Sequence, residues 1–150
     1  MRELTDDQRS PMNPASPSID AGWLLRNLLE QVPHARSAVV LAADGIPRAW
    51  QGLSQDNAQY LAATAAALIG AAHGMGNIVE VEGRMRQIVL EHDRYLAIFM
   101  AAGQGSILAV HADRAVNASH LAAEMVQMIN GLRAHLATPS RTPAVRGDAV

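Results

Sequence analysis

The most constraining feature of this sequence is a long stretch without charge. Between Asp56 and Glu80 there is no Asp, Glu, Lys or Arg, and the alanine-rich residues 58–72 have the composition of a helix. A helix on the surface of a soluble protein normally shows a charged face to water. We therefore expect both sides of this helix to be covered, one by the protein's own core and the other by a membrane or a second chain. Within residues 58–73 the polar side chains are only Gln59, Tyr60, Thr64 and His73.

Composition excludes several function classes. At 150 residues the chain can form one domain with a real core. A net charge of −2 and an aromatic content of 3% give neither a basic footprint nor a stacking surface for nucleic acid. All twelve basic residues are Arg, which excludes a Schiff-base or P-loop lysine, and the absence of Cys excludes thiolate chemistry. The amino terminus has no apolar run after a basic start, so the expected compartment is the cytoplasm.

Proline-rich polar segments at both ends enclose the expected domain. Residues 1–17 and 138–150 are predicted to be disordered tails, and residues 18–137 a single folded domain. Local signals mark its elements: Ser18, Ser54 and Asn117 are good helix N-caps, and Asp44-Gly45 is a strong hairpin signal. Gly74 is expected to end the middle helix.

The expected order of elements is α-β-β-α-β-β-β-α. Strands come as a pair and then a triplet with short turns, which favours an α+β domain with a five-stranded antiparallel sheet. The middle helix would cover one face and the terminal helices the other. The predicted segments are a helix from Ser18 to Pro33, strands 37–42 and 47–51, a helix 54–74, an extended segment 78–82, strands 84–91, 95–101 and 106–111, and a helix from Asn117.

No catalytic, cofactor-binding or metal site is expected. The six histidines lack the spacing of a zinc site. His92-Asp93 falls at a turn, and the glycines at 74 and 76 follow a helix and not a strand, unlike a phosphate-binding loop. Gly103-Gln-Gly-Ser106 lacks the final glycine and the helix of a nucleophile elbow. A weak hydrolase is therefore the least favoured function.

A second copy of the chain is the favoured cover for the middle helix. A membrane span is disfavoured, because alanine gains little from lipid and the flanking residues are acidic. One face, formed by Leu61, Ala65, Leu68, Ile69 and Ala72, is expected to lie on the sheet. Small residues recur every fourth position on the other side and would let two helices approach closely. That ridge consists of Ala62, Ala66, Gly70 and Gly74.

The strand at residues 84–91 offers a second route to assembly. As the first strand of the triplet it can lie at the sheet edge and pair with its own copy, although Arg84 and Arg86 would normally protect such an edge. The predicted dimer contacts on this segment are Arg84, Arg86, Ile88 and Leu90.

These features resemble the roadblock / dynein light chain superfamily, and in particular its bacterial single-domain members. The resemblance rests on the element order, on Ala38-Val-Val-Leu-Ala-Ala-Asp-Gly45 in the first hairpin and on the alanine-rich helix after Gly52-Leu-Ser54. Further support comes from Arg86-Gln-Ile-Val-Leu-Glu91 and from Leu108-Ala-Val110 before the last helix. It covers residues 20–136 and carries no catalytic signature.

The resemblance implies a homodimeric platform for a small Ras-like GTPase. The two copies would pair their middle helices and the edge strands that follow, and bacterial members are often encoded beside a GTPase and a sensor kinase. We expect the GTPase to meet Asn57, Tyr60 and Thr64 near the paired helices. The alternative is a small-molecule sensor domain of related α+β shape, which a cavity lined by Trp50, Tyr95 or Phe99 would favour.

Overall fold

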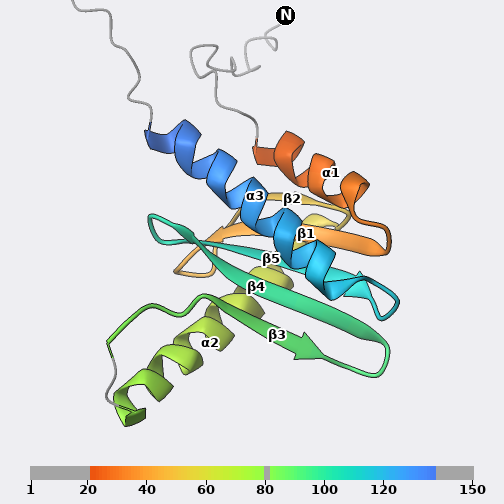
Figure 1. Ribbon diagram of the computed structural model, residues 1–150. Helices are drawn as coiled ribbons and strands as arrows, with labels where there is room; N and C mark the ends of the chain where they lie inside the picture. Colours follow the sequence, from red (N-terminus) through yellow and green to blue (C-terminus); the bar gives the residue numbers. More distant parts are fainter. Residues whose placement is uncertain (1–20, 80–81, 138–150) are drawn as a thin grey trace, which may run out of the picture.

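Five antiparallel strands form a sheet with helices on both faces (Figure 1). The computed structural model describes residues 21–79 and 82–137, so both predicted tails and the Ser18 cap lie outside the described residues. The α+β class and the predicted order of elements are confirmed. The elements are α1 (Ala21–Gln31), β1 (Ala35–Ala42), β2 (Pro47–Gln51), α2 (Gln55–Val79), β3 (Gln87–Glu91), β4 (Tyr95–Gly103), β5 (Ser106–Asp113) and α3 (Ala118–Ala137).

The strand order β2-β1-β5-β4-β3 places β2 and β3 at the two edges. Both edge positions agree with the sequence: β2 begins with Pro47, and β3 is the first strand of the triplet. The hairpin between β1 and β2 uses the predicted turn, in which Gly45 has a φ of 90°. The Asp44 carboxylate accepts a hydrogen bond from the Ile46 amide at 3.0 Å, which supports the turn.

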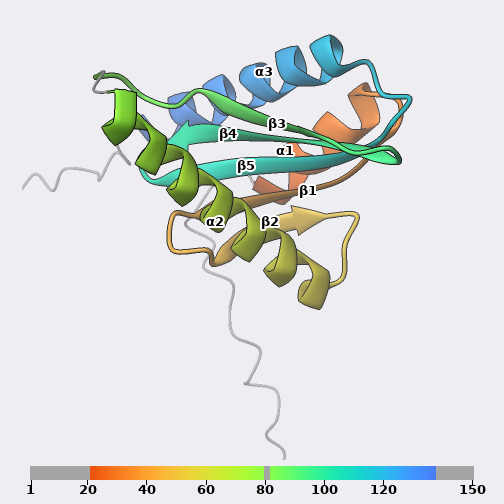
Figure 2. The same cartoon turned by 90° about the horizontal axis from the view of Figure 1, so that it is seen from below.

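The sheet lies between α2 on one face and α1 and α3 on the other (Figure 2), and it separates two hydrophobic clusters. Alternate residues of β1 serve each layer: Val39 and Leu41 pack in the layer under α2, whereas Ala38 and Val40 pack under α1 and α3. This period of two is what a strand covered on both faces requires. The predicted placement of the middle helix on one face and the terminal helices on the other is confirmed.

Helix α2 begins as predicted but ends later. The Ser54 hydroxyl accepts a hydrogen bond from the Asn57 amide at 3.1 Å, which is an N-cap. The expected end at Gly74 is wrong, because the helix continues through it to Val79. Gly74 does not adopt the left-handed conformation of a C-cap; the next glycine with a positive φ is Gly83, at 145°. The predicted extended segment therefore begins with two helical residues.

The triplet differs from expectation at three strand boundaries, because β3 begins three residues later and β4 and β5 each end two residues later, at Gly103 and Asp113. Strand β3 begins at Gln87 and not at residue 84, so Arg84 and Arg86 precede the ladder with β4. Helix α3 is capped as predicted, since the Asn117 side-chain oxygen accepts from the His120 amide at 3.0 Å. Its Met125 is fully buried and packs in the layer under α1 and α3.

Candidate functional site

Helix α2 presents an apolar surface to solvent over most of its length. Its buried residues, Ala58, Ala62, Ala65 and Ile69, form one narrow stripe against the sheet. The opposite side includes Tyr60 and Ile78, which are 74% and 77% exposed. In Figure 2 the helix crosses the sheet diagonally, and it packs on β1, β2 and β5. The outer side of α2 is therefore a long apolar surface that the described chain leaves uncovered.

The predicted ridge of small residues does not form one surface. Ala62 is fully buried against the protein's own sheet and cannot face a second copy in this fold. Ala66 is half-buried beside the first hairpin, where a Cβ on Gly45 would lie 3.5 Å from the Ala66 Cβ. Gly70 and Gly74 are exposed. The reason is geometric: a step of four residues turns about 40° past a full turn, so three such steps rotate the ridge by about a third of the circumference.

A different set of small residues faces outward. We name this set the outer stripe, and it consists of Ala63, Ala67, Gly70, Ala71 and Gly74, all of which are exposed. A Cβ on Gly70 or Gly74 would have no neighbour within 4 Å. Steps of four and three residues keep the stripe on one side of the helix. The four-residue spacing in the sequence identifies Gly70 and Gly74 as members of this stripe but misses Ala63, Ala67 and Ala71. A helical wheel centred on the buried residues of α2 places all five on the opposite side of the helix.

Leu61 and Leu68, predicted to lie on the sheet, are only half-buried, although they pack against the α2 layer of the core. They flank the buried stripe, whereas the predicted sheet contacts Ala65 and Ile69 are buried. The larger side chains therefore line the border between the covered and open sides of α2.

The outer edge of β3 is open in the described part of the chain, where β3 pairs only with β4. Ile88 and Leu90 are half-buried and pack in the α2 layer, while Val89 points to the other face and is 44% exposed. Arg84 and Arg86 are exposed just before the strand. An edge of this kind can pair with another strand.

A hollow of about 330 Å³ lies between the start of α2 and the sheet. Asn57, Tyr60 and Thr64, the predicted GTPase-facing residues, line it together. Tyr95 and Phe99 line it from β4. Trp50 is absent from this lining and packs instead against the α2 layer of the core. Sequence reasoning thus names most of the polar lining without predicting the hollow itself.

Two further side chains of this hollow are not anticipated by the sequence. Ser37 on β1 is 2% exposed, and its hydroxyl has no hydrogen-bond partner. His111 on β5 lies beside Tyr95, with ring centroids 5.4 Å apart. Unpartnered buried hydroxyls are uncommon, and among the described residues the Ser37 Oγ is the one buried side-chain polar atom without a partner.

The His92-Asp93 turn has a structural role. The His92 Nδ1 accepts a hydrogen bond from the Arg94 amide at 3.1 Å, and its ring stacks on Tyr95 at a centroid distance of 4.5 Å. Within residues 21–79 and 82–137, no three His, Asp or Glu side chains gather in a group that could hold a metal ion.

The one perturbed ion pair in the described chain joins β1 to β5. The Arg36 Nε donates to the Asp113 carboxylate at 2.8 Å. This hydrogen bond lowers the pKa of Asp113 and raises that of Arg36. Both groups lie at the surface and not in a cleft, so the perturbation reflects a strand-to-strand contact and not a poised catalytic acid.

By length and composition alone, α2 could cross a membrane. Core helices of soluble proteins pass the same test. Here Ala58, Ala62 and Ala65 are fully buried by the same chain, so one side of α2 packs on the sheet. Only 17% of the apolar window is buried within the described chain, so the rest of the helix is uncovered.

The comparisons with known proteins agree with the fold. Residues 21–112 match the profile of the Roadblock/LC7 domain. The chain superposes on the crystal structure of a Roadblock/LC7 domain from Streptomyces avermitilis with 37% identity and a TM-score of 0.75, over 78% of this chain and 98% of that one. No curated protein gave a match.

Two more distant solved structures share the fold. They are the gliding protein MglB from Thermus thermophilus, with 18% identity, a TM-score of 0.70 and coverage of 80% and 90%, and Myxococcus xanthus MglB, with 14% identity, a TM-score of 0.71 and coverage of 80% and 97%. At these identities the likeness concerns the fold alone.

Proposed function

The chain belongs to the Roadblock/LC7 family, and we propose that it is a non-catalytic homodimer that holds or regulates a small Ras-like GTPase in a bacterial signalling system. The resemblance drawn from the sequence implies this role for bacterial single-domain members. The observation that carries the proposal is the uncharged, exposed outer side of α2. A soluble monomer rarely leaves so long an apolar surface in water.

The outer stripe provides the first dimer contact. Its members carry at most a methyl group, so the α2 helices of two copies can approach closely around a two-fold axis. Met75, Ile78 and Val79 continue the apolar surface to the end of the helix, each more than half exposed. Their burial by a second copy would remove most of the large apolar side chains that α2 leaves in water.

The edge of β3 provides the second contact. Pairing of two β3 strands around the same axis would join the two sheets into one. Ile88 and Leu90, already half-buried under α2, would then lie at the centre of the joined layer. Arg84 and Arg86 stand outside the strand, and we assign them a different role below.

The GTPase contact is proposed for the start of α2. Asn57, Tyr60 and Thr64 cluster there, and Tyr60 is 74% exposed. An exposed tyrosine beside a hollow is a common anchor in protein interfaces, since its ring contributes area and its hydroxyl a hydrogen bond. We propose that the protein acts in the cytoplasm, with any membrane or sensor-kinase contact made through its partners.

Binding to the GTPase is tested by pull-down of candidate GTPases in both their GDP and GTP states. We expect retention in at least one state, and we expect Tyr60→Ala to weaken it by about tenfold or more. Trp23→Ala is the matched control, because Trp23 is a similarly exposed aromatic residue on α1, on the other face. Equal loss in both variants, or no retention of any candidate in either state, would argue against the proposal.

A small-molecule sensor remains the second candidate, favoured by the hollow beneath Tyr60. Its lining by Tyr95 and Phe99 is the feature expected of such a sensor, and the unpartnered Ser37 hydroxyl lies in the same lining. Ser37→Ala distinguishes the two functions. If the hydroxyl binds a ligand, the variant loses affinity for that ligand; if it is merely unsatisfied, the variant is as stable as the parent or slightly more so.

A further inference from the structure

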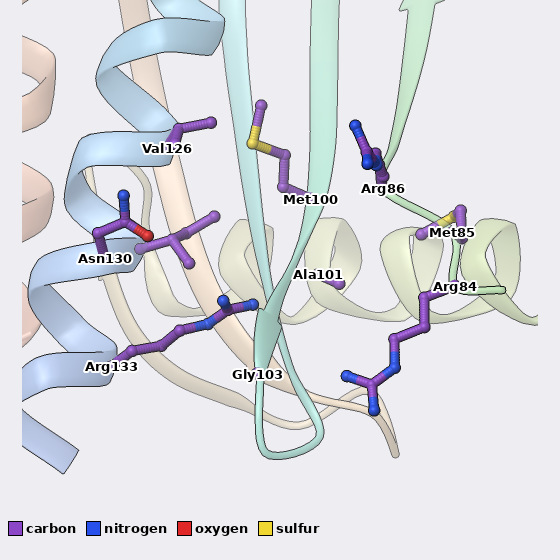
Figure 3. A pocket seen from close by; sticks show the side chains of 10 residues that line it. Arg84, Met85, Arg86, Met100, Ala101, Gly103, Val126, Asn130 and Arg133 are labelled. Atoms are coloured by element: carbon purple, nitrogen blue, oxygen red, sulfur yellow. The ribbon is translucent and has the colours of Figure 1, made fainter. Parts of the chain in front are cut away.

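The face of the sheet opposite to α2 carries a second and larger hollow. It has a volume of about 640 Å³ and lies between α3, the end of β4 and the segment that leads into β3 (Figure 3). We name it the arginine hollow, after Arg84, Arg86 and Arg133 in its lining.

Three guanidinium groups surround this hollow without any acidic side chain in its lining. In the described chain the arginine ion pairs are Arg36 with Asp113 and Arg114 with Glu91, so none of the three has a carboxylate partner there. Like charges gathered around a cavity raise its local potential, which favours an anionic ligand.

Gly103 allows Arg133 to lie across the end of β4. A Cβ at position 103 would stand 2.9 Å from the Arg133 Nε and 3.6 Å from its Cγ. Figure 3 shows Arg133 reaching from α3 toward Gly103, with Arg84 on the other side of the strand end. Because Gly103 has no side chain, the Arg133 side chain can pack against the backbone at the end of β4, beside the hollow.

Apolar side chains form the rest of the lining. Met100 and Ile129 are buried, whereas Val126 on α3 is 47% exposed. Asn130 adds an amide next to Arg133 (Figure 3). The hollow therefore combines a cationic rim with an apolar floor, and its ligand should carry both kinds of group.

We propose that the arginine hollow binds an acidic peptide segment of a partner protein. Carboxylates of the segment would accept hydrogen bonds from Arg84, Arg86 and Arg133, and one aliphatic side chain would rest on Met100, Val126 and Ile129. Carboxylate and guanidinium groups match in geometry and can pair through two hydrogen bonds.

Other anions fit less well. A free phosphate would leave most of a 640 Å³ space and its apolar floor unused. A single-stranded nucleic acid is bound by aromatic residues that stack on its bases and by a broad basic surface. The lining of this hollow has no aromatic residue, and the chain has a net charge of −2. A lipid surface is recognised by an extended set of protruding apolar groups, whereas Val126 is the one large apolar side chain of this lining that is exposed.

The test is selection from an unbiased phage-displayed library of random peptides on the full-length protein. We expect the parent protein to enrich peptides in which Asp or Glu flanks an aliphatic residue. The triple variant Arg84→Gln, Arg86→Gln, Arg133→Gln should lose that enrichment. Arg48→Gln is the matched control, because Arg48 is an exposed arginine on β2, at the opposite edge of the sheet.

An enriched peptide, labelled with fluorescein, then gives the affinities by anisotropy. Removal of one charge-assisted contact should weaken binding at least about tenfold in Arg133→Gln, with no change in Arg48→Gln. Val126→Asp should also abolish binding, because it places a competing carboxylate beside the arginines. Enrichment of non-acidic peptides, or equal losses in Arg133→Gln and Arg48→Gln, would overturn the proposal. Binding to phosphatidylserine vesicles that is lost in Arg133→Gln, together with a failure to enrich any peptide, would also overturn the proposal.

Discussion

Gly70→Leu should stabilise the monomer and weaken the dimer. Gly70 lies inside α2, with a negative φ and no atom within 4 Å of an added Cβ. In a helix interior glycine is less favourable than leucine by about 0.7 kcal/mol, so the dissociated chain should gain about this amount and melt a few degrees higher. On the outer stripe, in contrast, the leucine stands where the second copy must come close.

The expected cost to the dimer is larger than the gain to the monomer. Forcing extra methylene groups into a close helix contact costs about 1–3 kcal/mol, which corresponds to a dimer weaker by about five- to 150-fold. A dilution series in sedimentation velocity measures the dimer, and thermal unfolding at the lowest concentration measures the monomer.

Gly131→Leu is the matched control for this prediction. Gly131 is an exposed glycine inside α3, also with open space at its Cβ, so it should give the same gain in helix stability without any change in dimer affinity. A Gly70→Leu protein that dimerises as tightly as the parent would refute the assignment of the outer stripe. A Gly70→Leu monomer less stable than the parent would refute the claim that position 70 faces open space.

Other substitutions test the fold. Gly52→Ala should destabilise the protein by about 2 kcal/mol or more in urea unfolding, because the φ of Gly52 is 80° and a Cβ there would lie 2.3 Å from the Arg36 carbonyl oxygen. Gly76→Ala should instead stabilise the protein by up to about 1 kcal/mol, because Gly76 lies inside α2 with open space at its Cβ. Met125→Ala should cost about 2–5 kcal/mol in the same assay, because Met125 is fully buried. The folded-state pKa of Asp113 is lowered by Arg36, so this carboxylate stabilises the fold above its unfolded pKa of about 4 and loses that effect as the pH falls through the lower folded value. An NMR titration of Arg36→Gln should show the Asp113 pKa rising toward its ordinary range; an unchanged pKa would contradict the assigned cause.

Much of the fold could be predicted because its signals are local. Asp44 and Gly45 carry the chemistry of the first turn, and the Ser54 and Asn117 side chains cap the helices that follow them. Each of these signals acts within a few residues, so no tertiary information is needed to detect it.

The errors arise where the meaning of a residue depends on its surroundings. The sequence predicts a helix end at Gly74, yet Gly74 does not adopt the positive φ of a C-cap glycine and the helix continues to Val79. The prediction for Ala62 fails because spacing alone does not show which side of a uniform alanine helix meets the sheet. Leu61 is predicted to lie on the sheet because of its size, yet it is only half-buried, so side-chain size also fails to identify the buried side of this helix.

The arginine hollow lies out of reach of sequence reasoning. In the sequence, Arg84 and Arg86 indicate protection of an edge strand or a dimer contact at that edge, but not an anion site, and no motif singles out Arg133. The hollow exists because the end of β4 and the middle of α3 come together with the segment before β3. Such a meeting of segments follows from the topology, which no local spacing encodes.

The two proposed surfaces should respond to salt in opposite ways. The outer stripe and the last turns of α2 contain no charged residue among those described, so contact between two copies there depends on shape and apolar burial, which moderate salt does not weaken. Peptide binding in the arginine hollow depends on exposed guanidinium groups, whose attraction for carboxylates is largely screened at high ionic strength. Between about 0.05 and 0.5 M NaCl we expect the dimer to remain while the peptide dissociates, measured on one sample by sedimentation velocity with a fluorescent peptide. If the dimer dissociates with the peptide, charged residues such as Arg84 and Arg86 belong to the dimer contact, and the division between the two surfaces is wrong.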